Sequence, residues 1–119
     1  METEGVPMLA HERLDVYQRS VEFLALSAQV LDEMPKGNAT LADQLRRASL
    51  SIPLHVAEGV GKSSRPDPRS FFHNARGSAM ECAAILDACR VLHLARPELI
   101  ASAKALVVRI VCMLSKIGR

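Results

Sequence analysis

The amino-acid sequence predicts an all-α fold, an antiparallel up-down-up-down four-helix bundle formed as a single domain over residues 1–119. Apolar residues recur at alternating steps of three and four in four separate segments. Short linkers rich in Gly, Pro, Asn and Ser separate these segments. Aromatic residues make up only 3% of a chain that is 49% hydrophobic, and this composition suits helices packed on helices better than a sheet.

The first helix is predicted over residues 15–34. Asp15 is the expected N-cap, because its carboxylate accepts free amide hydrogens of the first turn. The Pro-Lys-Gly-Asn sequence at residues 35–38 then turns the chain. The expected core stripe of this helix consists of Leu14, Tyr17, Val21, Leu24, Ala28 and Leu31.

The second helix is predicted over residues 41–60. Thr40, followed three residues later by Asp43, resembles a capping box. Gly59 or Gly61 is the expected C-terminal end, because glycine adopts the left-handed conformation without strain. The expected core stripe consists of Leu41, Leu45, Ala48, Ile52 and Val56.

The third and fourth helices are predicted over residues 68–95 and 97–117. Asp67 is the expected N-cap of the third helix, and Pro68 follows it in the first turn, where a missing N–H costs nothing. The expected core stripes are Phe72, Ala75, Ala79, Cys82, Leu86 and Cys89 in the third helix, and Leu99, Ala103, Leu106, Ile110, Met113 and Ile117 in the fourth.

Three of these helices also carry apolar residues away from the core stripes. They are Phe23, Leu26, Val30, Phe71, Ile85, Val91, Val107, Val108 and Val111. A bundle helix needs about three apolar positions per heptad, so this excess predicts a second buried face. We therefore expect the chain to self-associate as a homo-oligomer.

Composition and charge exclude several classes of protein. A net charge of +2 and a pI of about 8.6 describe a mildly basic chain, well short of a nucleic-acid-binding arm. The first residues are acidic and lack the apolar core of a signal peptide. A lysine and an arginine interrupt the most hydrophobic segment, residues 100–114, so no membrane span is expected. We expect reduced, buried thiols at Cys82, Cys89 and Cys112 in a cytoplasmic protein.

A continuous polar line runs along the second helix beside its apolar stripe. Its members, spaced by three or four residues, are Gln44, Arg47, Ser51, His55 and Glu58. One interpretation is a solvated face beside the core. The other is a site or interface that includes Ser78 and Glu81 of the third helix. Pro53 favours the second, because a proline inside a helix costs about 3 kcal/mol unless its kink is used, here to bend the helix towards a partner.

Five sequence motifs occur in order along the chain. They are Leu14-Asp15-Val16-Tyr17-Gln18, Gln44-Leu45-Arg46-Arg47-Ala48, Ser51-Ile52-Pro53, Ala57-Glu58-Gly59, and Ala75-Arg76-Gly77-Ser78 with Glu81. Together they resemble the four-helix-bundle family encoded by intervening sequences in bacterial 23S ribosomal RNA genes. They are also similar to the accessory variability protein of diversity-generating retroelements. The resemblance covers nearly the whole chain, and His55 departs from the asparagine that is usual there.

The resemblance implies a compact antiparallel bundle that assembles into a ring-like homopentamer. It also implies nucleic-acid binding. On this view a polar set holds the second helix to the third or to a neighbouring subunit, and we interpret it as forming the assembly before any catalytic role. The set consists of Arg47, Ser51, Pro53, His55, Glu58, Ser78 and Glu81.

Basic residues are densest around the linker between the second and third helices, where only Asp67 opposes them. The arginine pair of the second helix is expected to lie at the same end or side. The candidate phosphate-binding residues are Arg46, Arg47, Lys62, Arg65, Arg69 and Arg76. In one subunit such residues are ordinarily a solvated loop and helix start, but repeated around a ring they form a positive belt for phosphates. The few aromatics offer no stacking platform, so binding would depend on backbone charge and shape.

The sequence contains no enzyme motif. The single His-x-x-Glu at His55 and Glu58 differs from the paired Glu-x-x-His motifs of di-metal bundles. No P-loop, dinucleotide fingerprint or nucleophile elbow occurs, so we expect neither catalysis nor a metal nor a cofactor. The leading hypothesis is an oligomeric bundle that binds structured RNA or DNA. The alternative is an oligomeric protein-interaction scaffold without nucleic-acid binding, which contacts a protein partner through apolar residues such as Leu26 or Val108.

Overall fold

Four α-helices make up almost all of the structure. The computed structural model describes residues 14–61 and 69–117. Helix α1 spans Asp15–Glu33, α2 spans Ala39–Gly61, α3 spans Arg69–Val91 and α4 spans Pro97–Ile117. No strand occurs within the described ranges. The prediction of an all-α four-helix bundle is confirmed.

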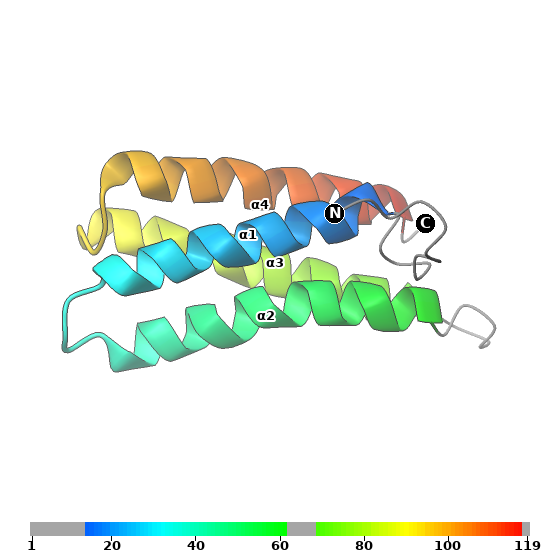
Figure 1. Cartoon of the computed structure of the whole chain (residues 1–119), viewed down its shortest axis with the longest axis horizontal. Coiled ribbons are helices and arrows are strands. Elements are labelled where there is room, and N and C mark those ends of the chain that lie inside the picture. The colour runs from blue at the N-terminus through cyan, green and yellow to red at the C-terminus, as the bar shows by residue number, and fades with distance from the viewer. Residues whose placement is uncertain (1–13, 62–68, 118–119) are drawn as a thin grey trace, which may run out of the picture.

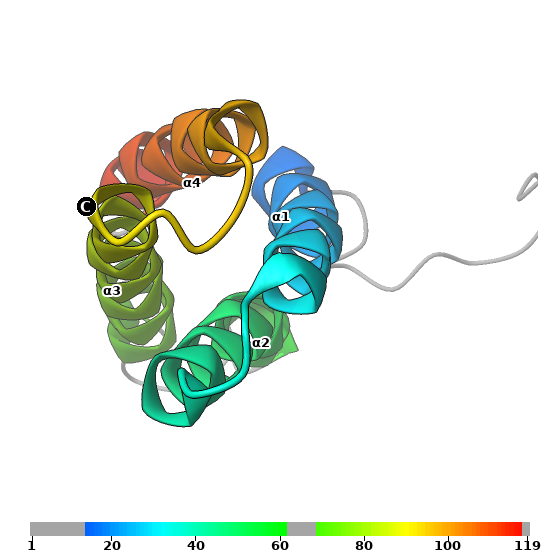
Figure 2. The same ribbon diagram turned by 90° about the vertical axis from the view of Figure 1, so that its left-hand side faces the viewer.

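Consecutive helices run in opposite directions along the bundle (Figure 1). Seen from one end, the helices stand in chain order around four corners, so that each packs against the two beside it (Figure 2). Among the described helices, α2 and α4 occupy opposite corners and make no close backbone contact. The end of α2, the start of α3 and the end of α4 therefore lie at the same end of the bundle.

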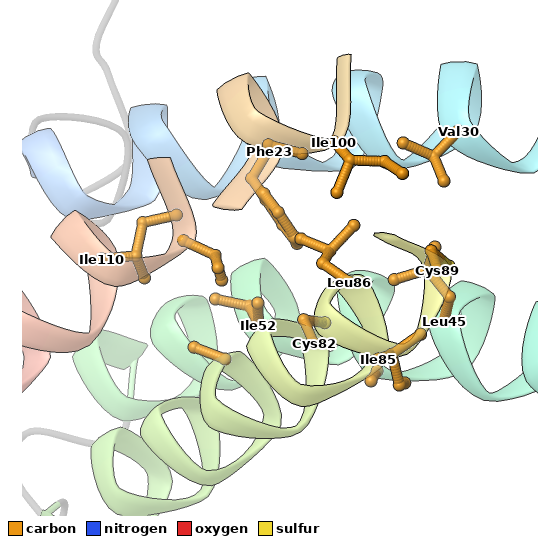
Figure 3. Close-up of a cluster of buried hydrophobic side chains, with 14 of the residues drawn as sticks. Phe23, Val30, Leu45, Ile52, Cys82, Ile85, Leu86, Cys89, Ile100 and Ile110 are labelled. Carbon is orange, nitrogen blue, oxygen red and sulfur yellow. The ribbon is translucent and has the colours of Figure 1, made fainter. Parts of the chain in front are cut away.

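Aliphatic side chains from all four helices fill the core. Phe23, the largest fully buried side chain, reaches from α1 into the centre towards Leu86 of α3 (Figure 3). The core stripes predicted for the second and third helices are largely correct. Leu45, Ala48, Ile52 and Val56 of α2 and Ala75, Ala79, Cys82, Leu86 and Cys89 of α3 are all buried.

The core stripe predicted for the first helix is wrong. Val21 and Ala28, which it included, are exposed. The residues of α1 that are buried are Val16, Ser20, Phe23, Ser27 and Val30. Two serines interrupt this true stripe, so a search for apolar residues favours the neighbouring face. The Ser20 hydroxyl can be buried because it donates to Tyr17 O at 2.8 Å within the helix.

The core also takes up part of the apolar surface that predicted self-association. Four of the supposed surplus residues, Phe23, Val30, Ile85 and Val107, belong to the core of the subunit itself. Val91 and Val108 do remain exposed. The case for self-association therefore depends on particular exposed residues and not on a general excess of apolar ones.

Helix α3 ends at Val91, short of its predicted end. Leu94 N–H donates to Cys89 O at 2.9 Å and His93 N–H donates to Arg90 O at 3.2 Å. These are the two hydrogen bonds of a Schellman C-cap. His93 takes the left-handed position, with φ of 56°, that glycine usually fills. Because no glycine marks this helix end in the sequence, the pattern extended the helix too far.

The first two helix starts also differ from the predicted caps. Leu14 occupies the N-cap of α1, so Asp15 is already the first helical residue. Helix α2 begins directly after Asn38, whose carbonyl accepts the first helical hydrogen bond. It therefore starts before the capping box predicted at Thr40. The cap predicted for the third helix lies outside the described residues.

A salt bridge joins the α3–α4 connection to the end of α1. The Glu33 carboxylate accepts Arg96 N–H at 2.8 Å through Oε1 and Arg96 Nε–H at 2.7 Å through Oε2. The backbone hydrogen bond, followed by the guanidinium, holds the pKa of Glu33 below its ordinary value. The Arg96 carbonyl accepts from Leu99 and Ile100, so the same residue begins α4. This contact ties the start of α4 to the end of α1.

Candidate functional site

The part of the predicted polar set that joins α2 to α3 is a pair of serines. Ser51 Oγ donates to Ser78 Oγ across the two helices at 2.5 Å. His55 Nδ1 lies 2.9 Å from Ser51 O. Because a carbonyl only accepts, His55 must carry a proton on Nδ1, which leaves Nε2 of the neutral ring as an acceptor. Ser51, Ser78 and His55 are all half-buried, so they belong to the packed seam between the helices.

Helices α2 and α3 also approach each other closely near the end of α2. Gly59 is buried in the last turns of α2, and a Cβ at this position would lie 2.9 Å from Phe72 Cζ of α3. A side chain at this position would therefore crowd the Phe72 ring, which would have to shift. Helix α2 continues past Gly59 to Gly61, so Gly59 is not the end of the helix.

The charged members of the polar set do not join α2 to α3. Arg47, Glu58 and Glu81 are exposed, and none has a hydrogen-bond or ion-pair partner among residues 14–61 and 69–117. The prediction that they hold these two helices together within the subunit is therefore wrong for the described chain. Their contact with a neighbouring subunit stays a prediction.

The bend towards a partner predicted at Pro53 stays a prediction, because a proline can bend a helix without interrupting it. Helix α2 is continuous through this residue from Ala39 to Gly61, and Pro53 is buried. Two residues from Ser51 correspond to about 200° around a helix, so the proline ring lies away from the polar line. It packs inside the subunit and is not available to a partner.

An exposed apolar stripe runs along α3. Gly77, in the helix interior, is exposed, and a Cβ there would have no atom within 4 Å. Met80 and Val91 lie on the same exposed stripe and are 48% and 62% exposed, with Ala84 between them. Nothing in the described subunit covers this stripe.

The predicted phosphate-binding residues do not form one cluster. Arg46 is bound to Asp43 Oδ1 at 2.9 Å. From Arg47 to Gly61 α2 rises about 21 Å, which separates the arginine pair from Arg69 at the start of α3. The expectation that these groups share one end of the bundle is wrong. Lys62 and Arg65 lie outside the described residues.

Arg76 is oriented by α4. Its Nε donates to Ser115 Oγ at 2.7 Å, and Ser115 Oγ in turn donates to Val111 O at 2.8 Å. This contact brings the end of α4, and with it the exposed Lys116, to the start of α3. Lys116 was missed in the sequence, although antiparallel topology alone places the end of α4 beside the start of α3. Arg69, Arg76 and Lys116 therefore share one end of the molecule, which we call the basic end.

The cysteines offer no activated nucleophile. Burial raises the pKa of Cys82 to about 12, and the nearby Glu81 charge adds to the rise. Burial also raises the pKa of Cys89. Cys112 is exposed, so the prediction of a third buried thiol is wrong. Cys112 lies on the outer face of α4, away from the core.

No metal or membrane site is evident in the described chain. Among residues 14–61 and 69–117, no three His, Cys, Asp or Glu side chains gather closely enough to hold a metal ion. None of the four described helices is both long and apolar enough to cross a membrane. The polar features of the structure are thus a serine seam, unpaired surface charges and a basic end.

Comparison with protein-family models matches residues 12–116 to a family described as 23S rRNA-intervening sequence protein. A search of curated proteins found no match. The matched range runs from before α1 to the last turn of α4 and contains the serine seam and the basic end. This family is not a known enzyme family. The resemblance to it that was inferred from the sequence motifs is confirmed. The chain belongs to the 23S rRNA-intervening sequence protein family.

Proposed function

We propose that this chain is a non-enzymatic, cytoplasmic homo-oligomer, a ring of five subunits, that binds structured RNA or DNA through a repeated basic surface. The observation that supports it best is the basic end of the bundle. Arg69 is exposed at the start of α3, Arg76 is held by Ser115, and Lys116 is exposed at the end of α4. The segment that links α2 to α3 adds Lys62 and Arg65 in the sequence.

The geometry of Arg76 suits phosphate contact. Ser115 fixes the guanidinium through Nε, so the two terminal nitrogens remain to donate to an anion. A single subunit offers too few such groups for strong binding. Five copies around a ring would multiply the contacts, and each neutralised phosphate adds to a salt-dependent affinity.

The positions of the aromatic side chains indicate how this surface would bind nucleic acid. Of the chain's four aromatic residues, Phe23 is buried in the core, and Tyr17, Phe71 and Phe72 are half-buried. These aromatic rings are not arranged on the surface to stack on splayed bases. We therefore expect recognition of phosphate backbone and duplex shape, with little reading of sequence.

A fluorescence-anisotropy titration with a hairpin RNA and a duplex DNA, at low and near-physiological salt, tests this proposal. Arg69→Glu should weaken binding at both salt concentrations and reduce the slope of log K against log salt by about one per lost phosphate contact. Arg90→Glu is the matched control, because Arg90 is an exposed arginine at the opposite end of the same helix. Equal loss in both variants, or binding that ignores salt, would contradict the proposal.

The exposed stripe of α3 favours the alternative of a protein-interaction scaffold without nucleic-acid binding. Met80 and Val91 present apolar surface that no described residue covers. Val108 of α4, 44% exposed, is a sound position to test this alternative, whereas Leu26 packs against the core and its replacement by a charge would damage the fold. The scaffold predicts no nucleic-acid affinity near physiological salt, so the same titration separates the two.

A further inference from the structure

We propose that the outer stripe of α2 in one subunit packs in parallel against the outer stripe of α4 in the next. This inference rests on the proposed self-assembly and names the two surfaces that meet. The α2 stripe consists of Arg47, Leu50, Leu54 and Glu58, and the α4 stripe of Glu98, Ala101, Ala105 and Arg109.

The α2 stripe places two large apolar side chains between opposite charges. Leu50 and Leu54 are 46% and 53% exposed, which is unusual for leucines one turn apart on a helix in a folded domain. Arg47 lies before them and Glu58 after them, both exposed and without a partner among the described residues. The stripe is therefore an apolar contact with an unpaired charge at each end.

The α4 stripe has the opposite character at every position. Ala101 and Ala105 are exposed small residues, which let another helix approach closely. Glu98, before them, is exposed and has no ion-pair partner among the described residues. Arg109, after them, is exposed and makes only a 3.9 Å ion pair with Asp15, so most of its guanidinium is free.

The two stripes match in spacing as well as in chemistry. Successive members follow at steps of three, four and four residues in both helices. In a parallel alignment Arg47 faces Glu98, and Glu58 faces Arg109, at the same time. Between these pairs the leucines of α2 meet the alanines of α4, a large side chain against a small one at each level. Each end-to-end span is about 16 Å, or three helical turns.

Parallel pairing also determines the kind of assembly. Helices α2 and α4 run in the same direction within a subunit and occupy its opposite corners (Figures 1 and 2). Contact between α2 of one copy and α4 of the next therefore keeps all subunits pointing the same way. The contact joins two different surfaces, so it is heterologous and closes as a ring when the rotation between neighbours allows. The bundle axes would then lie along the axis of the ring.

Thiol cross-linking tests the register directly. The same alignment places Cys112 of α4 opposite Gly61 of α2, and a Cβ at Gly61 would have no atom within 4 Å. Cys112 is exposed, whereas Cys82 and Cys89 are buried and unreactive. Gly61→Cys, treated with a short bis-maleimide, should give covalent dimers, trimers and larger products on a denaturing gel. A link within one chain is not expected, because α2 and α4 make no close contact in the bundle.

Gly77→Cys is the matched control. Gly77 is also an exposed helical glycine with open space at its Cβ, but it lies on α3. We expect its thiol to remain unlinked between chains, as should Gly61→Cys combined with Cys112→Ser. Cross-links in the unaltered chain through Cys112 alone, or equal products from both glycine variants, would overturn the proposed pairing.

Light scattering coupled to gel filtration distinguishes failure of the pairing from failure of the assembly. An oligomer that gives no Gly61→Cys cross-link would refute the α2–α4 pairing and leave self-assembly standing. A monomer at every concentration would refute both. As a second measurement, Arg47→Glu should raise the concentration required for assembly by about tenfold. Adding Glu98→Arg should restore it, because the reversed pair is again attractive.

Discussion

Two glycines inside helices predict opposite effects of the same substitution, and the structure supplies the magnitude of each. Gly59→Ala would place a Cβ 2.9 Å from Phe72 Cζ and 3.1 Å from both Cε atoms. Crowding of this kind costs about 1–3 kcal/mol. Alanine returns up to about 1 kcal/mol of helix propensity, and less here because Gly59 lies near the end of α2. We expect a net loss of about 1–2 kcal/mol in the free energy of unfolding.

Gly77→Ala is the matched comparison. The position lies inside α3, is exposed and has no atom within 4 Å of an added Cβ. Only the propensity term applies, so the free energy of unfolding should rise by about 0.5–1 kcal/mol. Assembly should be unchanged, because the proposed contact uses α2 and α4.

Urea unfolding followed by circular dichroism measures both effects. The measurements should be made at several protein concentrations, because assembly adds to the apparent stability. Phe72→Leu should relieve the crowding, so Gly59→Ala should cost less than half as much in that background. A stabilising Gly59→Ala, or equal costs in both backgrounds, would refute the packing argument. A destabilising Gly77→Ala in the separated subunit would refute the assignment of that glycine to open surface.

Three further predictions concern single residues. His93→Gly should raise the free energy of unfolding by about 1 kcal/mol in the same urea assay, because glycine adopts the left-handed conformation of the α3 cap without strain; a loss would show that the imidazole makes a stabilising contact. Glu33 has a folded pKa below its unfolded value, so its bond to Arg96 contributes stability above the unfolded pKa and loses it as the pH falls through the folded one. Glu33→Gln should therefore flatten the decline in the free energy of unfolding as the pH falls below about 4.5, the ordinary pKa of this carboxyl, and an unchanged acid limb would contradict this. In the native protein an aromatic disulfide reagent should titrate Cys112 alone, with Cys82 reacting only after unfolding, and rapid native reaction of Cys82 would contradict its burial.

The core of α2 and α3 could be predicted because their stripes contain little besides apolar residues. Ile52 and Leu86, for example, follow the helical period without interruption and are fully buried. In α1 the true stripe includes Ser20 and Ser27, also fully buried. A serine carries no hydrophobic signal, and whether its hydroxyl finds a partner such as Tyr17 O depends on the helix already being formed. The apolar period alone therefore selected the wrong face.

The end of α3 was beyond sequence reasoning for a different reason. His93 adopts a conformation that its residue type disfavours, and Leu94 stabilises it by packing into the core, where it is only 8% exposed. The tertiary contact offsets the local preference. The predicted grouping of the basic residues was wrong because it ignored position along the bundle axis. Arg47 and Arg69 lie on adjacent helices but at different levels of the bundle.

The polar line of α2 shows why a surface shared between subunits is hard to recognise from one helix. The period of three and four places Arg47, Ser51 and Glu58 in one line, yet the line spans two environments. Ser51 turns into the seam and bonds to α3, whereas Arg47 and Glu58 face outward beside Leu54. The outward-facing charges can be distinguished from Ser51 only by comparison with a second exposed stripe that has the same spacing and opposite charges. Helix α4 carries such a stripe. In the proposed pairing, Arg47 and Glu58 of α2 would meet Glu98 and Arg109 on α4 of the next subunit, and this would give the unpaired charges of α2 a physical reason.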